Sequence, residues 1–478
     1  MRGLSLLVSL AVVLAGCGAG QQFSPVAHGV TGGKFKPRSL RADGSRFSKH
    51  HVLLRAGGEV QPAAPGVVVS QRFGEHQVHR LPPGLTVEQA IAAYQQAPGV
   101  TRIERLELFP VEQQVAPAPA APPAIQVPRA PAPAAAANDP RLFEQWSHAI
   151  ARVPGAWQIT RGRPDVLVAA LDTGADASHP DLLGQVIDGP DMAEGKPDSR
   201  DIDSHGTHVA GIIAAKADNG IGVAGVAPGC RVLAIKIFEP YFEDGKYKGT
   251  YYNPISLAKA LHYAATQGGA KVINISAGIA DDELVSQMLA FARGHGLVVC
   301  VSAGNRGSNA YTGQAKYLDG VLAVHATDPM DRLARFSNFG HTLGVSAPGA
   351  SILSTVPTYA HPHTGEPPKG DGFESLNGTS MASPFVAAVA ALATSAMLEA
   401  VESNLRATTG RDVKLTPAQL PGALVEDLIR QSCVDLGVPG RDEVYGAGRV
   451  DAERAVRAAQ SPEWVERATR ETLRMRRR

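Results

Sequence analysis

Short apolar runs alternate with helical segments over the larger part of the chain, residues 138–459. Four runs are almost wholly apolar and only a few residues long, at 166–171, 232–235, 272–275 and 297–301. Runs without polar alternation are typical of strands that are buried on both faces of a parallel sheet. Between them, apolar residues recur at helical spacing in 208–217, 256–267 and 282–294. The pattern predicts an α/β fold in which helices flank a parallel sheet.

A smaller module precedes this region, at residues 50–114. Segments at its start and end alternate apolar and polar residues, and a segment that opens at Thr86 keeps helical spacing as far as Tyr94. We therefore expect a small α+β domain. The residues after it, 115–137, are mostly Ala and Pro, with 18 of the 22 residues at 116–137 being one or the other, which predicts an extended linker that proteases can reach.

The two ends of the chain differ from the rest. Residues 1–17 contain Arg2, an apolar run and Cys17, and they are too short to span a bilayer, so we interpret them as a signal peptide for export. Their ending is similar to the bacterial lipobox, which predicts a lipid on Cys17 and retention in the cell envelope. Ordinary cleavage nearby, with secretion, is the alternative. Residues 460–478 form a basic tail, which we expect to be solvated rather than a binding arm.

Charge excludes one class of partner. The chain has 46 Lys and Arg against 45 Asp and Glu, a net charge of +1, so no field of one sign attracts nucleic acid or an anionic membrane surface. A membrane is therefore expected as a partner only through the lipid. Outside the signal peptide the cysteines are Cys230, Cys300 and Cys433. Because their number is odd, at least one is unpaired or pairs between chains.

Four motifs at strand ends or helix starts carry the candidate chemistry. Asp172 follows the first apolar run and is a candidate to orient an imidazole, and His205 opens a helical segment as the candidate general base. Ser380 opens an apolar helix predicted to reach Met397, where backbone N–H groups and the helix dipole favour a developing oxyanion, so it is the candidate nucleophile. Asn305 follows the last apolar run and is a candidate second donor to that oxyanion.

Each of these residues taken alone has an ordinary structural explanation, because Asp and Ser commonly cap helices and strands. Together, in the order Asp, His and Ser, they indicate a hydrolytic triad. Two competing motifs are weaker. His205 and His208 lack the Glu and the spacing of a zinc protease, and Ser256 with Lys259 lacks the companion K-T-G of the β-lactamase type. We interpret His208, Ser256 and Lys259 as helix residues.

The motifs read LDTG around Asp172, HGTHVAG from His205 and GTSMASP around Ser380. In this order they resemble the signatures of the subtilisin-like serine proteases, the subtilase family, and the likeness extends over residues 138–459. The resemblance implies a subtilisin-like fold, serine endopeptidase activity through an acyl-enzyme on Ser380, and Asn305 as the oxyanion donor. The preceding module is similar to the family's propeptide, which acts as folding chaperone and inhibitor until it is cut away. A small domain unrelated to inhibition is the alternative.

The resemblance also implies where a substrate binds. A peptide would pair as a strand with one short segment, and that segment and a second one would wall the pocket for the residue before the cut. The two segments are Ser276, Ala277, Gly278 and Ser302, Ala303, Gly304. Ala277, Ile279 and an insertion at 239–252 depart from the family's usual pattern, so the preference of the pocket stays open.

A calcium site of the family has matching positions in this chain. The side chains are those of Asp139, Asp181 and Asn219, and the backbone oxygens are those of Ile221 and Val223, an oxygen set that suits Ca²⁺. The loop that holds three of them is one residue longer than usual. Plain turn and cap residues are the alternative.

The sequence thus predicts an exported serine endopeptidase that is made as a zymogen, with protein or peptide substrates and its own propeptide as partners. Two alternatives stay open. One is a transpeptidase or cyclase that uses the same acyl-enzyme but excludes water. The other is a non-catalytic surface-binding protein on a protease scaffold.

Overall fold

The computed structural model describes residues 46–111, 138–279, 282–309, 320–340 and 344–475. The predicted signal peptide with Cys17 and the predicted linker at 115–137 lie outside the described residues. All the described residues belong to one compact unit, Leu40–Arg478. Cys230, Cys300 and Cys433 are buried and unpaired in it.

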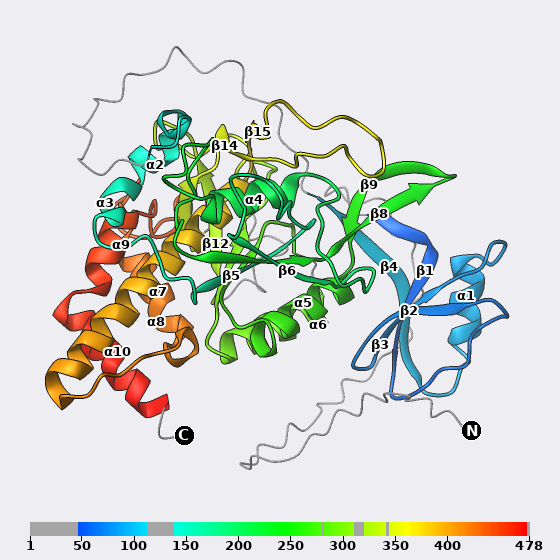
Figure 1. Cartoon of the computed structure of the whole chain (residues 1–478). Coiled ribbons are helices and arrows are strands. Elements are labelled where there is room, and N and C mark those ends of the chain that lie inside the picture. Colours follow the sequence, from blue (N-terminus) through cyan, green and yellow to red (C-terminus); the bar gives the residue numbers. More distant parts are fainter. Residues whose placement is uncertain (1–45, 112–137, 280–281, 310–319, 341–343, 476–478) are drawn as a thin grey trace, which may run out of the picture. The chain divides into compact units, whose positions relative to one another are not determined.

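A seven-stranded parallel sheet carries the sequence motifs (Figure 1). Its strand order is β13-β12-β11-β10-β5-β7-β6, and each neighbouring pair is parallel. The strands are β5 (Leu167–Asp172), β6 (Val186–Asp191), β7 (Arg231–Lys236), β10 (Ala270–Ile275), β11 (Val298–Ser302), β12 (Leu322–Thr327) and β13 (Val345–Pro348). The four apolar runs are β5, β7, β10 and β11, so the predicted parallel sheet is confirmed.

Helices cover both faces of this sheet, because successive residues of a strand point to opposite faces. Val168 and Ala170 of β5 share one core cluster with α4 (His205–Ala214), α7 (Thr379–Thr409), α8 (Gly422–Ser432) and α9 (Ala452–Ala459). Ala169 and Leu171 share the other with α5 (Pro254–Thr266) and α6 (Glu283–Gly294), which lie side by side in Figure 1. The shorter helices are η1 (Leu142–Glu144), α2 (Trp146–Ile150), α3 (Val153–Trp157) and η4 (Pro417–Gln419).

The helix that opens at Ser380 is longer than predicted. α7 ends at Thr409 rather than at Met397, because Leu398, Val401 and Leu405 continue its buried stripe. Gly410 then adopts a left-handed conformation with φ 67° and ends the helix. Within the part of the chain that the structure describes, α7 alone is long and apolar enough to cross a membrane, and its apolar window is wholly buried inside the fold. It is the core helix of the domain.

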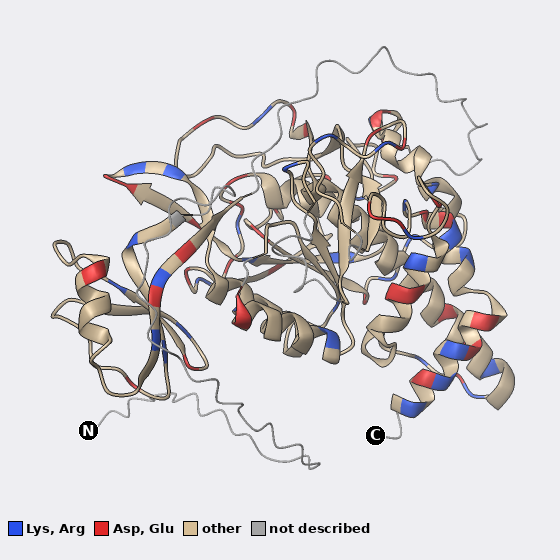
Figure 2. Cartoon of the chain, turned by 180° about the vertical axis from the view of Figure 1, so that it is seen from behind, with Lys and Arg blue, Asp and Glu red and all other residues tan. Residues whose placement is uncertain are grey.

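The prediction of a solvated tail at 460–478 is wrong for most of that segment. Residues 462–475 form α10 (Pro462–Met475), which packs on α7 and buries Trp464, Ala468 and Thr472. These three residues recur every four positions and therefore lie on one face of the helix. Basic and acidic residues share the rest of the helix, as the blue and red segments near the C-terminus show (Figure 2). The many Arg residues concealed this apolar stripe in the sequence.

The N-terminal module is α+β, as predicted. Its antiparallel strands lie in the order β2-β3-β1-β4 and pack with one helix around a core that includes Val52, Leu54 and Tyr94. The elements are β1 (Arg46–Ala56), β2 (Val68–Phe73), β3 (His76–Arg80), α1 (Val87–Tyr94) and β4 (Val100–Pro110). Thr86 caps α1 by accepting the backbone N–H of Gln89.

The predicted insertion at 239–252 forms a hairpin of β8 (Phe238–Glu243) and β9 (Lys246–Tyr252). β9 pairs antiparallel with β4, with Phe109 opposite Tyr252 and Pro110 opposite Tyr251. The hairpin and the N-terminal module therefore form one six-stranded sheet. A separate two-stranded sheet consists of β14 (Ile352–Thr355) and β15 (Phe373–Leu376).

Candidate active site

Asp172 and His205 form a buried hydrogen-bonded pair. Asp172 is the last residue of β5 and His205 is the first of α4, and His205 Nδ1 lies 2.7 Å from Asp172 Oδ1. The same carboxylate oxygen accepts the backbone N–H of Thr173 at 2.8 Å, and both side chains are 1% exposed. The carboxylate therefore favours the tautomer in which Nδ1 carries the proton and Nε2 is the base.

This pair also sets the proton affinity of His205. Burial alone lowers the pKa of His205, but the charge and hydrogen bond of Asp172, followed by the charges of Asp203 and Asp201, outweigh burial and raise the pKa to about 9. His208, one turn further along α4, behaves in the opposite way. Burial lowers its pKa to about 3, and its Nε2 donates to the backbone oxygen of Glu374 at 3.0 Å. The interpretation of His208 as a packed helix residue is confirmed.

Ser380, the second residue of α7, reaches the same edge of the sheet. Leu171 lies opposite Ile275 in the register of β5 and β10, so Asp172 and Ser276 are neighbours at the strand ends. Ser380 Oγ donates to the Ser276 backbone oxygen at 3.3 Å, and Ser276 Oγ donates to the Ser380 backbone oxygen at 2.8 Å. The imidazole Nε2 has no hydrogen-bond partner among the described residues. Proton transfer therefore requires the serine hydroxyl to turn toward Nε2.

Asn305 is fixed to the start of α7 by Thr379. Asn305 Oδ1 accepts the Thr379 backbone N–H at 2.8 Å and its hydroxyl at 2.9 Å, and Thr379 Oγ1 accepts the Gly304 N–H at 3.0 Å. A Cβ placed on Gly378 would lie 3.3 Å from Asn305 Nδ2 and 3.5 Å from the Ser380 nitrogen. The two candidate oxyanion donors, Asn305 Nδ2 and the Ser380 backbone N–H, therefore lie near the same point beside Gly378. Sequence reasoning missed Thr379, although its place between two motif residues was a signal.

The two predicted peptide-binding segments lie next to each other. They follow the neighbouring strands β10 and β11, and Ser302 Oγ donates to the Ala277 backbone oxygen at 3.3 Å. The Gly278 backbone oxygen accepts the hydroxyl of Tyr252, a residue of β9. The buried side chains of these segments are Ser276, Ala277, Ser302 and Ala303. The structure thus adds Tyr252, which the sequence analysis did not single out.

The side chains predicted to bind calcium also come together. Asn219 Nδ2 donates to Asp181 at 2.7 Å, and the Asn219 backbone N–H donates to Asp139 at 3.2 Å. The Val223 backbone N–H donates to Asp181 at 2.9 Å. Asp181 and Asp139 are 0% and 5% exposed, and neither forms an ion pair within the described ranges.

Burial is the largest influence on the carboxylates of this cluster. Burial raises the pKa of Asp181 to about 6, against the hydrogen bonds from Val223 and Asn219 and with a contribution from the charge of Asp139. The described residues hold no group of three or more His, Cys, Asp or Glu that suits a metal ion, so the oxygen set depends on the Asn219 amide and backbone carbonyls. The Asn219 amide turns its nitrogen toward Asp181 and its oxygen toward the Ile221 N–H, so it would have to turn over before its oxygen could join the two buried carboxylates as a ligand of the kind that Ca²⁺ takes.

Comparisons with known proteins agree with this geometry. The subtilase family model (Peptidase_S8) matches residues 163–448. The thermophilic serine proteinase of Bacillus sp. (strain AK1) is 41% identical over 238 residues, which are 50% of this chain and 54% of that protein, so the chain spans about half the length of that relative. Thermitase of Thermoactinomyces vulgaris is 37% identical over 272 residues, or 56% of this chain and 88% of thermitase.

A solved structure is similar as well. Fervidolysin from Fervidobacterium pennivorans, described as a keratinolytic enzyme related to subtilisin, superposes with a TM-score of 0.63 and 26% identity. The match covers 88% of this chain and 62% of fervidolysin. The family model spans more than half of the chain, and its range includes Asp172, His205, Asn305 and Ser380. The chain therefore belongs to the subtilase family of serine peptidases.

Proposed function

We propose that the protein is a serine endopeptidase that hydrolyses peptide bonds through an acyl-enzyme on Ser380. The observation that carries the proposal is the buried 2.7 Å contact of Asp172 with His205 at the sheet edge that also holds Ser380. His205 removes the hydroxyl proton, Ser380 Oγ attacks the peptide carbonyl, and Asn305 Nδ2 with the Ser380 N–H stabilises the oxyanion. His205 then protonates the leaving amine, and water hydrolyses the ester.

Peptide substrates would lie against the two segments that begin at Ser276 and Ser302, with their small buried side chains forming the walls of the pocket before the cut. Relatives of the chain are named as a thermophilic serine proteinase and an alkaline protease, which supports hydrolysis over transpeptidation and over a non-catalytic binding role.

Turnover and covalent labelling test this proposal together. We would compare wild type, Ser380→Ala and Ser403→Ala, which changes an exposed serine of the same helix. Wild type and Ser403→Ala should cut a denatured protein and take up an organophosphonate on Ser380, and Ser380→Ala should do neither. Absence of cutting and labelling in all three would leave a binding protein. Transfer of the acyl group to an added amine, with no hydrolysis, would leave a transpeptidase.

We propose further that the N-terminal module is a propeptide and that the chain is made as a zymogen. Val111 directly follows the residues of β4 that pair with β9, and its backbone N–H donates to the Thr250 backbone oxygen at 3.0 Å. Phe109 of β4 stacks on Tyr252 of β9 with 5.2 Å between ring centroids. The fervidolysin match covers 88% of the chain, more than residues 112–478 can supply, so it extends into this module. We place the maturation cut after Val111, in or near the linker at 115–137.

Intact mass tests the zymogen without a chosen substrate. Residues 18–478 would be purified as wild type and as Ser380→Ala and incubated side by side. Loss of the N-terminal module from wild type alone would show self-cleavage by Ser380. Equal cutting of both would assign the cut to another protease.

Export and lipid anchoring are proposals from the sequence. The apolar run in residues 1–17 and the lipobox-like ending at Cys17 support an exported protein that is retained at a bacterial membrane. Expression with a labelled fatty acid should mark the wild type but not Cys17→Ser, and should bring only the wild type into the membrane fraction. An unlabelled wild type in the medium would mean ordinary cleavage and secretion.

We also propose that Asp139, Asp181 and Asn219, with the backbone oxygens of Ile221 and Val223, hold a structural Ca²⁺. The ion would join the start of the domain to the loop after α4 and offset the repulsion of two buried carboxylates. In Ser380→Ala, which prevents self-digestion, chelation should lower Tm by several degrees, because a ligand stabilises the folded state that binds it. Adding Asp181→Asn should remove most of that shift. A shift of the same size in both proteins would contradict the site.

A further inference from the structure

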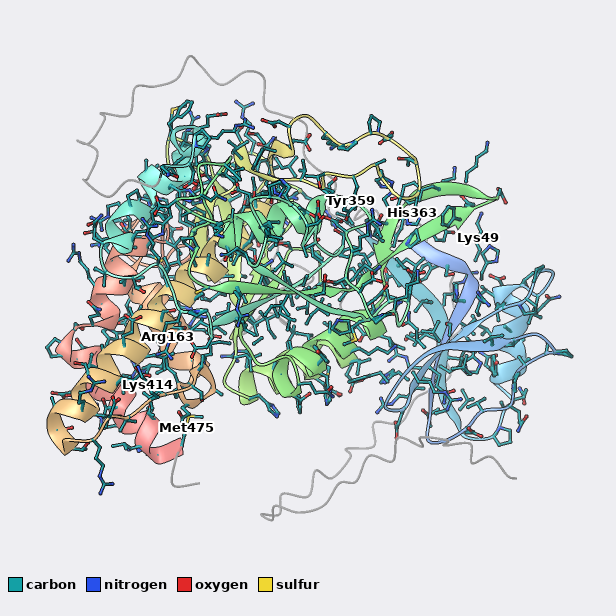
Figure 3. All side chains as sticks on the ribbon, in the orientation of Figure 1. Lys49, Arg163, Tyr359, His363, Lys414 and Met475 are labelled. Carbon is teal, nitrogen blue, oxygen red and sulfur yellow. The ribbon has the colours of Figure 1, made fainter. Side chains whose placement is uncertain are left out.

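Two segments that are far apart in the sequence meet through aromatic contacts, and we call the region where they meet the rim. One is the hairpin β8–β9, and the other is the loop 356–372 between β14 and β15. Tyr247 stacks on His363 with 5.6 Å between ring centroids and meets His361 edge-on at 5.4 Å, and Phe242 meets His363 at 5.8 Å. Figure 3 shows His363 beside the hairpin. We call these four rings the aromatic bridge.

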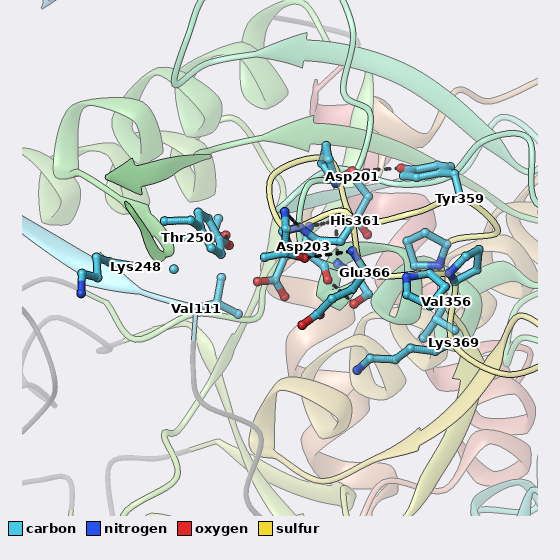
Figure 4. Close-up of a pocket in the computed structure, with 18 of the residues that line it drawn as sticks. Val111, Asp201, Asp203, Lys248, Thr250, Val356, Tyr359, His361, Glu366 and Lys369 are labelled. Carbon is cyan, nitrogen blue, oxygen red and sulfur yellow. Dashed lines mark hydrogen bonds between the residues drawn. The ribbon is translucent and has the colours of Figure 1, made fainter. Parts of the chain in front are cut away.

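A cavity of about 660 Å³ adjoins the aromatic bridge. Its walls include Tyr247 and His361 of the bridge, and Asp203 and Ser204, which directly precede the general base. In Figure 4, Val111 and Thr250 lie on one side of the cavity, and Asp203 and His361 lie on the other. The cavity therefore lies between β9 and the residues that directly precede the general base.

An extended peptide backbone already runs along this edge. Val111 donates its N–H to the Thr250 backbone oxygen at 3.0 Å and lines the cavity. The N-terminal module thus shows the course of a peptide beside β9, with one residue bordering the cavity. A valine side chain is short compared with a cavity of this volume, so the same position has room for a much longer side chain.

The carboxylate of Asp203 places a negative charge in the wall of the cavity. Within the described ranges, no hydrogen bond or ion pair reaches this carboxylate. The neighbouring Asp201 is saturated, since it accepts from Thr173, Ser204 and Thr207 and from the Asp203 backbone N–H. Burial, followed by the charge of Asp201, raises the pKa of Asp203. A cation beside Asp203 would stabilise its charged form.

The basic groups of the cavity wall are engaged elsewhere. Lys369 pairs with Glu374 at 3.0 Å, and Lys248 points away from Asp203 in Figure 4. His361 Nδ1 accepts the backbone N–H groups of His363 and Thr364, each at 3.2 Å. The charges of His205 and His361 act on Asp203, but among the described residues no Lys or Arg forms an ion pair with its carboxylate.

We propose that this cavity is a substrate subsite for a Lys or Arg side chain, with Asp203 as its charge partner. The side chain would belong to one of the three residues on the amino side of the cut bond, because the cavity wall includes Ser204, next to the general base, and Val111, which lies on the amino side of the proposed maturation cut. Its aliphatic stem would lie along Tyr247 while its charged end meets Asp203. This proposal rests on the proposed endopeptidase function and adds the substrate class to it.

A positional scan tests the subsite in the unmodified protein. The full-length chain would be incubated until its mass is constant and then given peptides that differ only by Lys, norleucine or Glu at each of the three positions. At one position, kcat/KM for Lys should exceed that for norleucine about tenfold, with Glu lowest. Equal rates at all three positions would overturn the subsite and leave the endopeptidase standing. Failure to cut any peptide would overturn both.

Variants then test whether Asp203 is the partner. Asp203→Asn should bring the ratio of Lys to norleucine close to one, and Asp203→Lys should invert the preference toward Glu. Asp198→Asn, at an exposed carboxylate of the same loop, is the matched control and should keep the ratio. Because each ratio is measured within one protein, a general loss of activity does not affect it. A ratio that survives Asp203→Asn would overturn the role of Asp203. If the variants do not fold, the wild-type preference must still shrink with rising salt, and a salt-independent preference would overturn the charge pairing.

Discussion

The carboxyl edge of the seven-stranded sheet and the rim above it are built in different ways. At the edge, Asp172 and His205 are 1% exposed and held 2.7 Å apart. At the rim, the aromatic bridge joins partly exposed rings of the hairpin β8–β9 and the loop 356–372 at centroid distances of 5.4–5.8 Å. Packed strands and the starts of α4 and α7 thus position the reacting atoms, while loops supply the surfaces that meet the substrate. We expect changes at the edge to act on the chemical step and changes at the rim to act on the choice of substrate.

The largest expected effect is at the edge itself. Asp172→Asn keeps the shape of the side chain but removes the charge that fixes the His205 tautomer, and kcat should fall by about 10⁴-fold. Steady-state kinetics on one peptide measure this loss, and Asp198→Asn serves as a control with the same chemical change on the surface. A loss below tenfold would mean that the buried contact does not orient the base.

A smaller loss is expected one step away from the proton transfer. Asn305→Ala removes one oxyanion donor and should lower kcat about 10²–10³-fold with KM nearly unchanged, the loss known for the corresponding donor in subtilisin. Thr379→Val keeps Asn305 but removes the hydroxyl that holds its Oδ1, so its loss should be intermediate. A change in KM alone for either variant would assign these residues to substrate binding.

The acidity of His205 gives the next prediction. Because the neutral imidazole is the base and its pKa is raised to about 9, kcat/KM should rise with pH, about tenfold per unit below that value, and level off above it. Stability has the opposite sign, since the favourable charge of His205 is fully present below its unfolded pKa and is lost as pH rises through about 9. A flat kcat/KM from pH 6 to 9, with chemistry rate-limiting, would contradict the assignment.

The edge was predictable from the sequence because its signals are local. Each apolar run became a buried strand, and Asp172, His205 and Ser380 stand where a strand ends or a helix starts. The rim was not predictable, because Tyr247 and His363 meet only through tertiary packing across more than a hundred residues. The extent of α7 and the packing of α10 were missed for other reasons. The prediction ended α7 at Met397 although its apolar stripe continues, and the many Arg residues of α10 concealed the apolar face of that helix.

The smallest expected effect tests whether rim and edge are electrostatically separate. The charge of Asp203 contributes to the raised pKa of His205, so Asp203→Asn should move the midpoint of the kcat/KM profile to lower pH. The profile would be recorded with a peptide that carries no basic residue, so that substrate choice does not enter, and Asp198→Asn should leave the midpoint in place. An unmoved midpoint with an altered Lys preference would mean that Asp203 acts on the choice of substrate and not on the pKa of His205. A moved midpoint would show that one carboxylate acts on both regions, because Asp203 lines the cavity beside the aromatic bridge and stands two residues before the general base.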